Sequence, residues 1–356
     1  MATNSPSTRI SAESVLSAAW QRRGLLAWLL WPLSLLFQLV VGVRRRLYAA
    51  GWQASVQLPV PVIVVGNIFI GGTGKTPLTI WLVQALRAAG YVPGVISRGY
   101  GAQPDDAESA VKHVTALSLA SEVGDEPLLI ARRAQCPVAV GRNRAAAAQA
   151  LLQAHPEVNL ILSDDGLQHY RLRRDIEIVL FDARGVGNGW LLPAGPLREP
   201  ASRRRDFTVV NADAMPASMP EASIRMKLVG EQAERLDDPA QVMLLSALQK
   251  SASGVPAVRI TAAAGIGNPQ RFFTMLSAAG LVFESVALPD HYDFSDNPFA
   301  AVQAEIILIT EKDAVKCRQI ETIKNDPRIW VVPVTAQIDK ALAHQIVEKL
   351  RGHPTA

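Results

Sequence analysis

A glycine-rich stretch after a β-branched run constrains this fold more than any other part of the sequence. Residues 62–65 are Val-Ile-Val-Val, and Gly71-Gly72-Thr73-Gly74-Lys75-Thr76-Pro77 follows shortly afterwards. A strand, a glycine-rich turn and a helix in this order form a phosphate-binding loop, because glycines let backbone N–H groups close around phosphate oxygens. Lys75 is expected to reach the β- and γ-phosphates and the Thr76 hydroxyl to contact Mg²⁺. The residues predicted to surround the nucleotide phosphates are Gly71, Gly72, Thr73 and Gly74.

The loop departs from the general pattern at one position. That pattern has a glycine five residues before Gly74, where this sequence has Phe69. The paired glycines that follow can supply the missing flexibility, and Pro77 suits the first turn of a helix, where its absent N–H is not needed. A plain glycine-rich turn with a surface lysine is the alternative, and the strand before it and the Lys-Thr pair after it favour phosphate binding.

Length and composition indicate a globular protein of more than one domain. A chain of 356 residues, 49% of them apolar, can form two separate cores. Its two cysteines, Cys136 and Cys317, are too few for a disulfide framework or a cysteine zinc site and fit a reducing compartment.

The positive charge is concentrated at the N-terminus. Residues 1–50 hold six arginines and one acid, whereas the rest of the chain holds 30 basic and 31 acidic residues. The pI of 9.2 therefore reflects a charged end rather than a basic face over the whole protein. We expect no nucleic-acid partner, and we expect a monomer.

An uncharged apolar run precedes the loop. Residues 24–43 hold no charged side chain, and arginines stand on both sides, at 22–23 and at 44–46. As a helix the run would be roughly 30 Å long, close to the thickness of a bilayer core. Tryptophan rings favour the membrane interface. They cluster around the run at Trp20, Trp28, Trp31 and Trp52.

Four interpretations of this run compete. A cleaved signal peptide does not fit an apolar run this long that three arginines follow at once. A membrane span is weakened by Pro32 and Gln38, whereas a helix lying within one leaflet suits arginines at both ends. A buried helix of a soluble protein is the last alternative. We expect a membrane-associated helix with membrane lipids as partners, and leave open whether it spans the bilayer.

Strands and helices alternate through the rest of the chain, which implies parallel sheets. The fold class we predict is α/β, with a P-loop-type domain built on a mostly parallel sheet, a second smaller α/β domain and an N-terminal membrane-associated helix. The expected bounds are 1–50 for the polar segment and helix, 51–211 for the nucleotide-binding domain, 212–240 for a linker and 241–356 for the C-terminal domain. Within the linker, residues 223–229 alternate like an edge strand. Gly265-Ile-Gly267 is too short a fragment of a dinucleotide fingerprint to predict a site.

Polar residues follow one of the predicted strands, at the end where ligands bind in open α/β sheets. Arg98 and Tyr100 come directly after the strand predicted for residues 92–97. Arg98 could pair with a phosphate, and Tyr100 could stack on a sugar or pack on an acyl chain. An exposed turn explains both residues equally well.

Two acidic pairs are candidates for the metal side of the site. Asp125 and Glu126 begin a predicted helix, where they could favour the helix dipole or act as a base and a metal ligand. Asp164 and Asp165 end an apolar strand downstream of the phosphate loop, where a carboxylate holds Mg²⁺ or orders its water. His169 follows closely, and taken alone it is more typical of a structural histidine.

With these residues in place, the chain resembles the tetraacyldisaccharide 4′-kinases, the lipid A 4′-kinases of Gram-negative bacteria. The resemblance covers nearly the whole length, and its motifs are specific in this order and company rather than singly. Besides the N-terminal apolar run, they lie at residues 66–68, 71–77, 97–101, 124–127, 164–169, 192–200, 264–272, 290–292 and 310–316.

The resemblance implies transfer of the γ-phosphate of ATP to the 4′-hydroxyl of an acylated glucosamine disaccharide 1-phosphate, giving lipid IVA. The enzyme would work at the cytoplasmic face of the inner membrane with ATP and Mg²⁺. It implies that Asp125, paired with His291, is the general base. Lys75 and Thr76 would hold the phosphates and Mg²⁺. The metal side would also include Glu126, Asp164 and Asp165, and the candidates for acceptor contacts are Asn67, Arg98, Tyr100 and His169.

Other functions remain open on the residues alone. A membrane-associated P-loop ATPase of the partitioning type typically has a lysine before the paired glycines, where this chain has Ile70. A nucleotide-dependent membrane adaptor would bind ATP without turnover, and the ATPase would hydrolyse it without an acceptor. A soluble nucleoside kinase does not explain residues 24–43.

Overall fold

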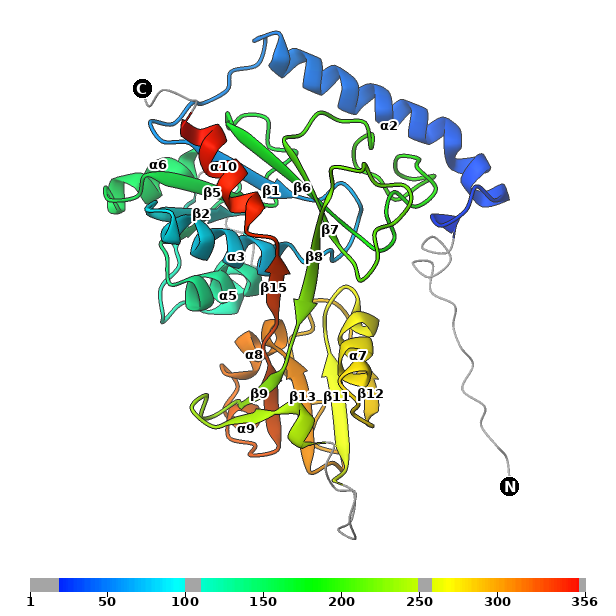
Figure 1. Cartoon of the computed structure of the whole chain (residues 1–356), viewed down its shortest axis with the longest axis vertical. Coiled ribbons are helices and arrows are strands. Elements are labelled where there is room, and N and C mark those ends of the chain that lie inside the picture. Colours follow the sequence, from blue (N-terminus) through cyan, green and yellow to red (C-terminus); the bar gives the residue numbers. More distant parts are fainter. Residues whose placement is uncertain (1–18, 100–109, 249–257, 352–356) are drawn as a thin grey trace.

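Two sheets organise the chain in the computed structural model, which describes residues 19–99, 110–248 and 258–351 (Figure 1). The larger sheet has the strand order β15-β8-β7-β6-β1-β5-β2-β4-β3 in the described residues. Its strands are parallel except where β3 pairs with β4 and β15 with β8. They span β1 (Val62–Gly66), β2 (Pro93–Ser97), β3 (Lys112–His113), β4 (Val138–Val140), β5 (Leu160–Asp164), β6 (Ile176–Asp182), β7 (Phe207–Asn211), β8 (Ile224–Val229) and β15 (Thr335–Ile338).

Both faces of this sheet are buried, as expected for parallel strands. Strand β1 alternates between two cores, since Ile63 and Val65 face one and Val62 and Val64 face the other. The first core includes residues of α3 (Lys75–Ala88), α5 (Asp125–Ala134) and α10 (Ala341–Arg351). The second includes α6 (Arg144–Ala154), and β1 is thereby fixed in the middle of the domain.

The second sheet is smaller and forms a domain of its own below the first in Figure 1. Its strand order is β10-β9-β14-β13-β11-β12. The strands are β9 (Gln232–Arg235), β10 (Val242–Leu244), β11 (Ile260–Ala264), β12 (Glu284–Ala287), β13 (Ile306–Thr310) and β14 (Ile329–Val332). The helices around it are α7 (Pro269–Ala278), α8 (Glu311–Cys317) and α9 (Glu321–Lys324), with a 3₁₀ turn η1 (Leu245–Ala247). A short helix α4 (Ala120–Val123) precedes α5 in the first domain.

The chain crosses between the two sheets twice, and both crossings differ from the expected bounds. Residues 212–240, expected to be a linker, contain β8 of the large sheet and β9 of the small one. Strand β8 lies between β7 and β15, so it is an interior strand and not the edge strand that its alternation suggested. After β14, the chain returns to the large sheet as β15 and then α10, which packs on the first domain.

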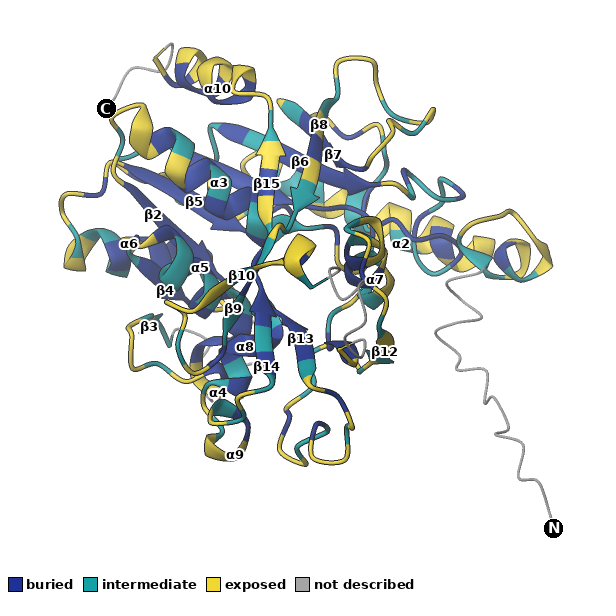
Figure 2. Cartoon of the chain, turned by 60° about the horizontal axis from the view of Figure 1, so that its bottom comes forward, coloured by how far each residue is buried: buried dark blue, intermediate teal, exposed yellow. Residues whose placement is uncertain are grey.

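The apolar N-terminal run forms α2 (Leu25–Ala49), which is long and apolar enough to cross a membrane, the only such helix among the described residues. It follows the outer edge of the large-sheet domain, and most of its surface is exposed (Figures 1 and 2). Large apolar side chains at 37% exposure or more are Leu25, Trp28, Leu29, Trp31, Leu33, Leu35, Leu36, Leu39, Val40 and Val43. Such an apolar face is costly to leave in water, which is consistent with membrane association.

Contacts near both ends fasten α2 to the protein body. Ser34 Oγ donates to the Leu191 carbonyl at 2.8 Å and accepts from the Ala194 N–H at 2.9 Å. The ring of Trp28 packs edge-on against that of Trp190, and Arg44 lies over the ring of Tyr170. In this structure α2 therefore lies along the protein surface rather than projecting from it.

Candidate active site

The phosphate loop takes the backbone shape that its glycines permit. Gly71 and Gly74 have φ angles of +98° and +97°, in the region that favours glycine. A β-carbon on Gly74 would also come within 2.5 Å of the Asn211 side-chain nitrogen, so a larger residue here would have to displace that side chain from its hydrogen bond with the Thr73 carbonyl. Helix α3 begins directly after it at Lys75, which aims the first turn of the helix at the loop.

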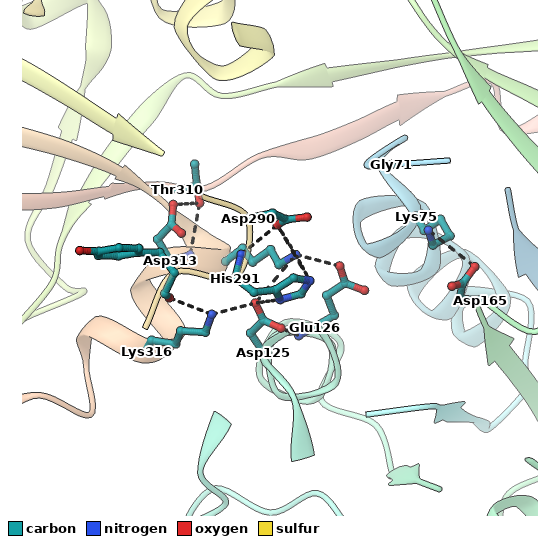
Figure 3. A network of polar contacts seen from close by, with 12 residues as sticks. Gly71, Lys75, Asp125, Glu126, Asp165, Asp290, His291, Thr310, Asp313 and Lys316 are labelled. Atoms are coloured by element: carbon teal, nitrogen blue, oxygen red, sulfur yellow. Dashed lines mark hydrogen bonds and ion pairs between the residues drawn. The ribbon is translucent and has the colours of Figure 1, made fainter. Parts of the chain in front are cut away.

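Lys75 is held by two polar side chains, Asn67 and Asp165, and Figure 3 shows its contact with Asp165. Its Nζ donates to Asn67 Oδ1 at 3.0 Å and lies 3.6 Å from Asp165 Oδ1. Asn67 is fully buried and also donates to the carbonyls of Phe69 and Gly71. It therefore ties the lysine to the loop backbone. In this structure Asn67 organises the loop from inside and does not present its side chain to an acceptor.

Asp164, at the end of β5, is buried and accepts a hydrogen bond from Thr79 Oγ1 at 3.3 Å. Burial, together with the nearby charge of Glu126, raises its pKa to about 7 despite the opposing charge of Lys75. Its second oxygen and Thr73 Oγ1 are buried without a hydrogen-bond partner in the described part of the chain. These oxygens fit a bound cation and phosphates, which would hold the carboxylate ionised.

The carboxylates here suit Mg²⁺ in particular. No three acidic, histidine or cysteine side chains among the described residues form a group able to hold a metal by themselves. Mg²⁺ is usually bound through one or two carboxylates together with substrate phosphates and water, so a complete protein cage is not required. Asp164 and the hydroxyl of Thr76, buried at the start of α3, are the donors closest in kind to that arrangement.

The pKa of Asp164 leads to a stability prediction. Because its folded pKa lies above the ordinary value of 3.8, the folded state binds more protons, and this carboxyl lowers stability as the pH rises from about 4 to about 7. Asp164→Asn should therefore stabilise the metal-free protein by about 1–3 kcal/mol at pH 8 and by less at pH 5, while phosphate transfer is lost. Urea unfolding in EDTA at both pH values measures this. Asp213→Asn, on the surface, is the control. An equal gain in the stability of the Asp164→Asn protein at both pH values would contradict the prediction.

A second cluster lies where the domains meet, at the start of α5 (Figure 3). Asp125 comes from the first domain and His291 from the loop after β12 in the second, and their Oδ2 and Nδ1 atoms are 3.1 Å apart. Burial alone would raise the pKa of Asp125. The hydrogen bond with His291 and the charges of Lys312 and Lys316 outweigh it and lower the pKa to about 2. Asp125 is therefore ionised and buried at neutral pH.

Lys312, on α8, is a member of this cluster that the sequence analysis did not single out. Its Nζ lies 3.1 Å from Glu126 Oε1, 3.4 Å from Asp290 Oδ1 and 3.5 Å from His291 Nε2. Burial lowers its pKa, but the charges of Glu126, Asp125 and Asp290 prevail and raise the pKa above its ordinary value. Only its place inside the motif at 310–316 hinted at a role.

Asp313 connects this cluster to the loop after β11. It is buried and accepts hydrogen bonds from Thr310 Oγ1 at 2.6 Å and from the Gly265 N–H at 3.0 Å. Thr310 in turn caps α8 by accepting from the Asp313 N–H. The Gly265-Ile-Gly267 turn is thus fixed to the helix that carries Lys312.

The acceptor candidates are placed unequally. Arg98 is exposed after β2, and Tyr100 lies outside the described residues. His169 is half-buried, and burial together with the charges of Arg144, Arg174, Arg44 and Arg171 lowers its pKa to about 4. Arg144 was not predicted. It is buried at the start of α6 and donates to the carbonyls of Gly141 and Asp164, so it joins Asp164 to this positive region.

Comparisons with known proteins point to one family. A family model described as tetraacyldisaccharide-1-P 4′-kinase matches residues 26–351. A tetraacyldisaccharide 4′-kinase from Janthinobacterium sp. (strain Marseille) is 64% identical over 98% of this chain and 99% of its own. One from Herminiimonas arsenicoxydans is 61% identical, with 98% of each chain covered. The crystal structure of LpxK from Aquifex aeolicus in complex with ATP matches with a TM-score of 0.74 and 27% identity, covering 92% of this chain and all of the other.

Proposed function

The chain belongs to the tetraacyldisaccharide-1-P 4′-kinase family, and from this we propose that it transfers the γ-phosphate of ATP to the 4′-hydroxyl of tetraacyldisaccharide 1-phosphate. The product is lipid IVA, in the biosynthesis of lipid A. The observation that supports this best is the pairing of a phosphate loop in one domain with a carboxylate–imidazole pair completed by the other.

On the nucleotide side, the phosphates lie against Gly71, Gly72, Thr73 and Gly74, with Lys75 reaching the transferred group. Phosphoryl transfer depends on positioning the reactants and on neutralising the charge of the phosphates. Mg²⁺ would be held by Thr76 and Asp164, with Asp165 and Glu126 at its outer side, and would neutralise charge on the phosphate oxygens. The orphaned oxygens of Thr73 and Asp164 support this assignment.

On the acceptor side, Asp125 and His291 act as one unit that accepts the proton of the 4′-hydroxyl. Asp125 is buried, and its low pKa makes it a poor base by itself. Its partner His291 is more exposed, so the imidazole meets the hydroxyl, and the carboxylate orients the ring and stabilises its protonated form. The family resemblance implied that Asp125 is the base, and we propose that His291 shares this role.

The acceptor is held beside α2. Arg98 and His169 stand on the side of the site that Arg144 and Arg174 make positive, which suits an anionic sugar phosphate. Tyr100 completes the proposed acceptor contacts, whereas Asn67 acts only indirectly, through the loop that it organises. The enzyme works as a monomer at the inner membrane, with its catalytic domains on the cytoplasmic side.

Membrane association through α2 can be tested on its outer face. Leu29 and Leu36 are 76% and 59% exposed, so replacing both with glutamate should leave folding intact and remove most binding to vesicles. Flotation with vesicles of anionic and zwitterionic phospholipids measures this. Val282→Glu, at 90% exposure in the second domain, is the control. Unchanged flotation of the double variant would show that α2 is not the membrane contact.

The proposed activity has a direct assay. Purified protein in detergent is incubated with γ-labelled ATP, Mg²⁺ and tetraacyldisaccharide 1-phosphate, and label is followed into lipid and free phosphate. Label in the lipid supports the kinase. Label released only as phosphate, with or without lipid, would instead indicate an ATPase, and nucleotide binding without turnover an adaptor.

A further inference from the structure

The second domain touches the phosphate loop itself, at a place separate from the Asp125–His291 pair. Gly267, in the turn before α7, packs against Gly72. A β-carbon on Gly267 would lie 3.2 Å from the Gly72 nitrogen, and one on Gly72 would lie 3.9 Å from the Gly267 Cα. The turn that was too short to predict a site therefore lies on the glycines that are proposed to receive the phosphates.

Arg271 makes the polar part of this contact. It lies in the first turns of α7, in the second domain, and its Nη1 is 3.4 Å from the carbonyl oxygen of Thr73 in the loop. Its Nη2 is 3.4 Å from Asp182 Oδ2, at the end of β6 in the first domain. One guanidinium thus bridges the second domain, the phosphate loop and the central sheet.

Asp182 is buried and shared by two arginines. Arg184 binds it through Nε and Nη2 at 2.7–3.1 Å and stacks on the ring of Phe69, 4.1 Å from its centroid. Arg184 also faces Gly71: a β-carbon added to Gly71 would lie 3.8 Å from Arg184 Nη1. Two guanidinium groups and one carboxylate leave an excess positive charge beside the loop. A buried carboxylate holds a bidentate arginine in a fixed geometry, which makes it a suitable anchor.

We propose that Arg271 is a positioning residue for nucleotide binding: together with Asp182, it holds the phosphate loop against the second domain. Because His291 belongs to the same domain, the arrangement that fixes the loop for ATP also brings the imidazole to Asp125. The nucleotide site and the base are thereby assembled by one docking event. This inference rests on the proposed kinase function for its catalytic consequence, but its effect on ATP binding is independent of transfer.

Arg271→Met tests the proposal. Binding of a fluorescent ATP analogue with Mg²⁺ in the absence of acceptor should weaken about 10-fold, because a hydrogen-bonded charge is lost. The KM for ATP should rise by the same factor. The KM for the lipid acceptor should stay within about twofold. Arg271→Lys, which keeps the charge but loses the planar group that reaches Thr73 and Asp182 with two separate nitrogens, should recover part of the affinity. Asp182→Asn should weaken ATP binding as well. The double variant should bind ATP no more weakly than the single variant with the lower affinity.

The controls separate positioning from folding. Arg259→Met removes an exposed arginine that pairs with Glu305 in the same domain, and it should change neither ATP binding nor thermal unfolding. ATP affinity within twofold of wild type in Arg271→Met, or an equal rise in both KM values, would overturn the proposal. Additive effects of Arg271→Met and Asp182→Asn would also overturn it. Failure of the wild type to phosphorylate lipid would refute the kinase function and leave the binding experiment unaffected.

Discussion

Replacing Lys75 with methionine should reduce phosphate transfer by roughly 10²–10³-fold, the usual effect of removing one preorganised donor from developing charge. Methionine keeps most of the side-chain volume, so the change is confined to the charge. Lys75 is largely buried between Asn67 and Asp165, and its ammonium cannot be replaced there by a mobile surface lysine. Initial rates of label transfer, at saturating and at limiting ATP, measure the loss.

Lys324→Met is the matched control, because Lys324 is an exposed lysine on α9 that pairs with Glu321. It should transfer phosphate like the wild type. A Lys75→Met enzyme that keeps more than a third of wild-type turnover would mean that this loop does not hold the transferred phosphate.

Removal of the imidazole should have the second large effect. His291→Ala is expected to lower kcat by roughly 10²–10⁴-fold, the range for general base catalysis, with little change in the affinity for ATP. Asp125→Asn should act similarly, because a neutral amide removes the negative charge beside the ring and can hold the wrong imidazole tautomer. Since the two side chains share one hydrogen bond, the double variant should be no slower than the slower single variant.

His344→Ala, on the exposed side of α10, controls for the loss of a histidine. Single-turnover rates with preformed enzyme–ATP complex separate the chemical step from binding. If His291→Ala and Asp125→Asn both kept near-normal rates, the base would have to be sought elsewhere in the site.

The local part of the site could be predicted from the sequence because its signals are local. The strand, the glycines and Lys75 are consecutive, and each restricts the backbone in a known way. Asp164 and Asp165 could be placed at the phosphate edge because a parallel strand ends there. The apolar run of α2 was equally clear, since no residue outside it is needed to recognise it.

The contacts between domains could not be predicted in the same way. Lys312, Arg271 and Asp182 are far apart in sequence, and their roles arise only when two sheets are placed against each other. A single arginine on a helix looks like a solvated side chain until its partner is known. The pairing of Asp125 with His291 was available only through the family resemblance, because nothing local to either residue requires the other.

The return of the chain to the large sheet also could not be predicted from the order of the elements. Strand β15 and α10 continue the α/β alternation of the second domain, and their apolar pattern gives no sign of which core they join. Likewise β8 alternates as an edge strand would, although β7 and β15 flank it. Periodicity shows which face of an element is buried, but not against which sheet.

The second domain is thus an insertion within the first, and this sets an order for folding during translation. All strands of the small sheet have been synthesised once Val332 is made, whereas the large sheet lacks its last strand until residue 338. Its core also lacks Leu342, Ile346 and Leu350 of α10 until those residues have been made. Helix α2 is made before both sheets, and the domain to which it is fastened is completed only after the small sheet.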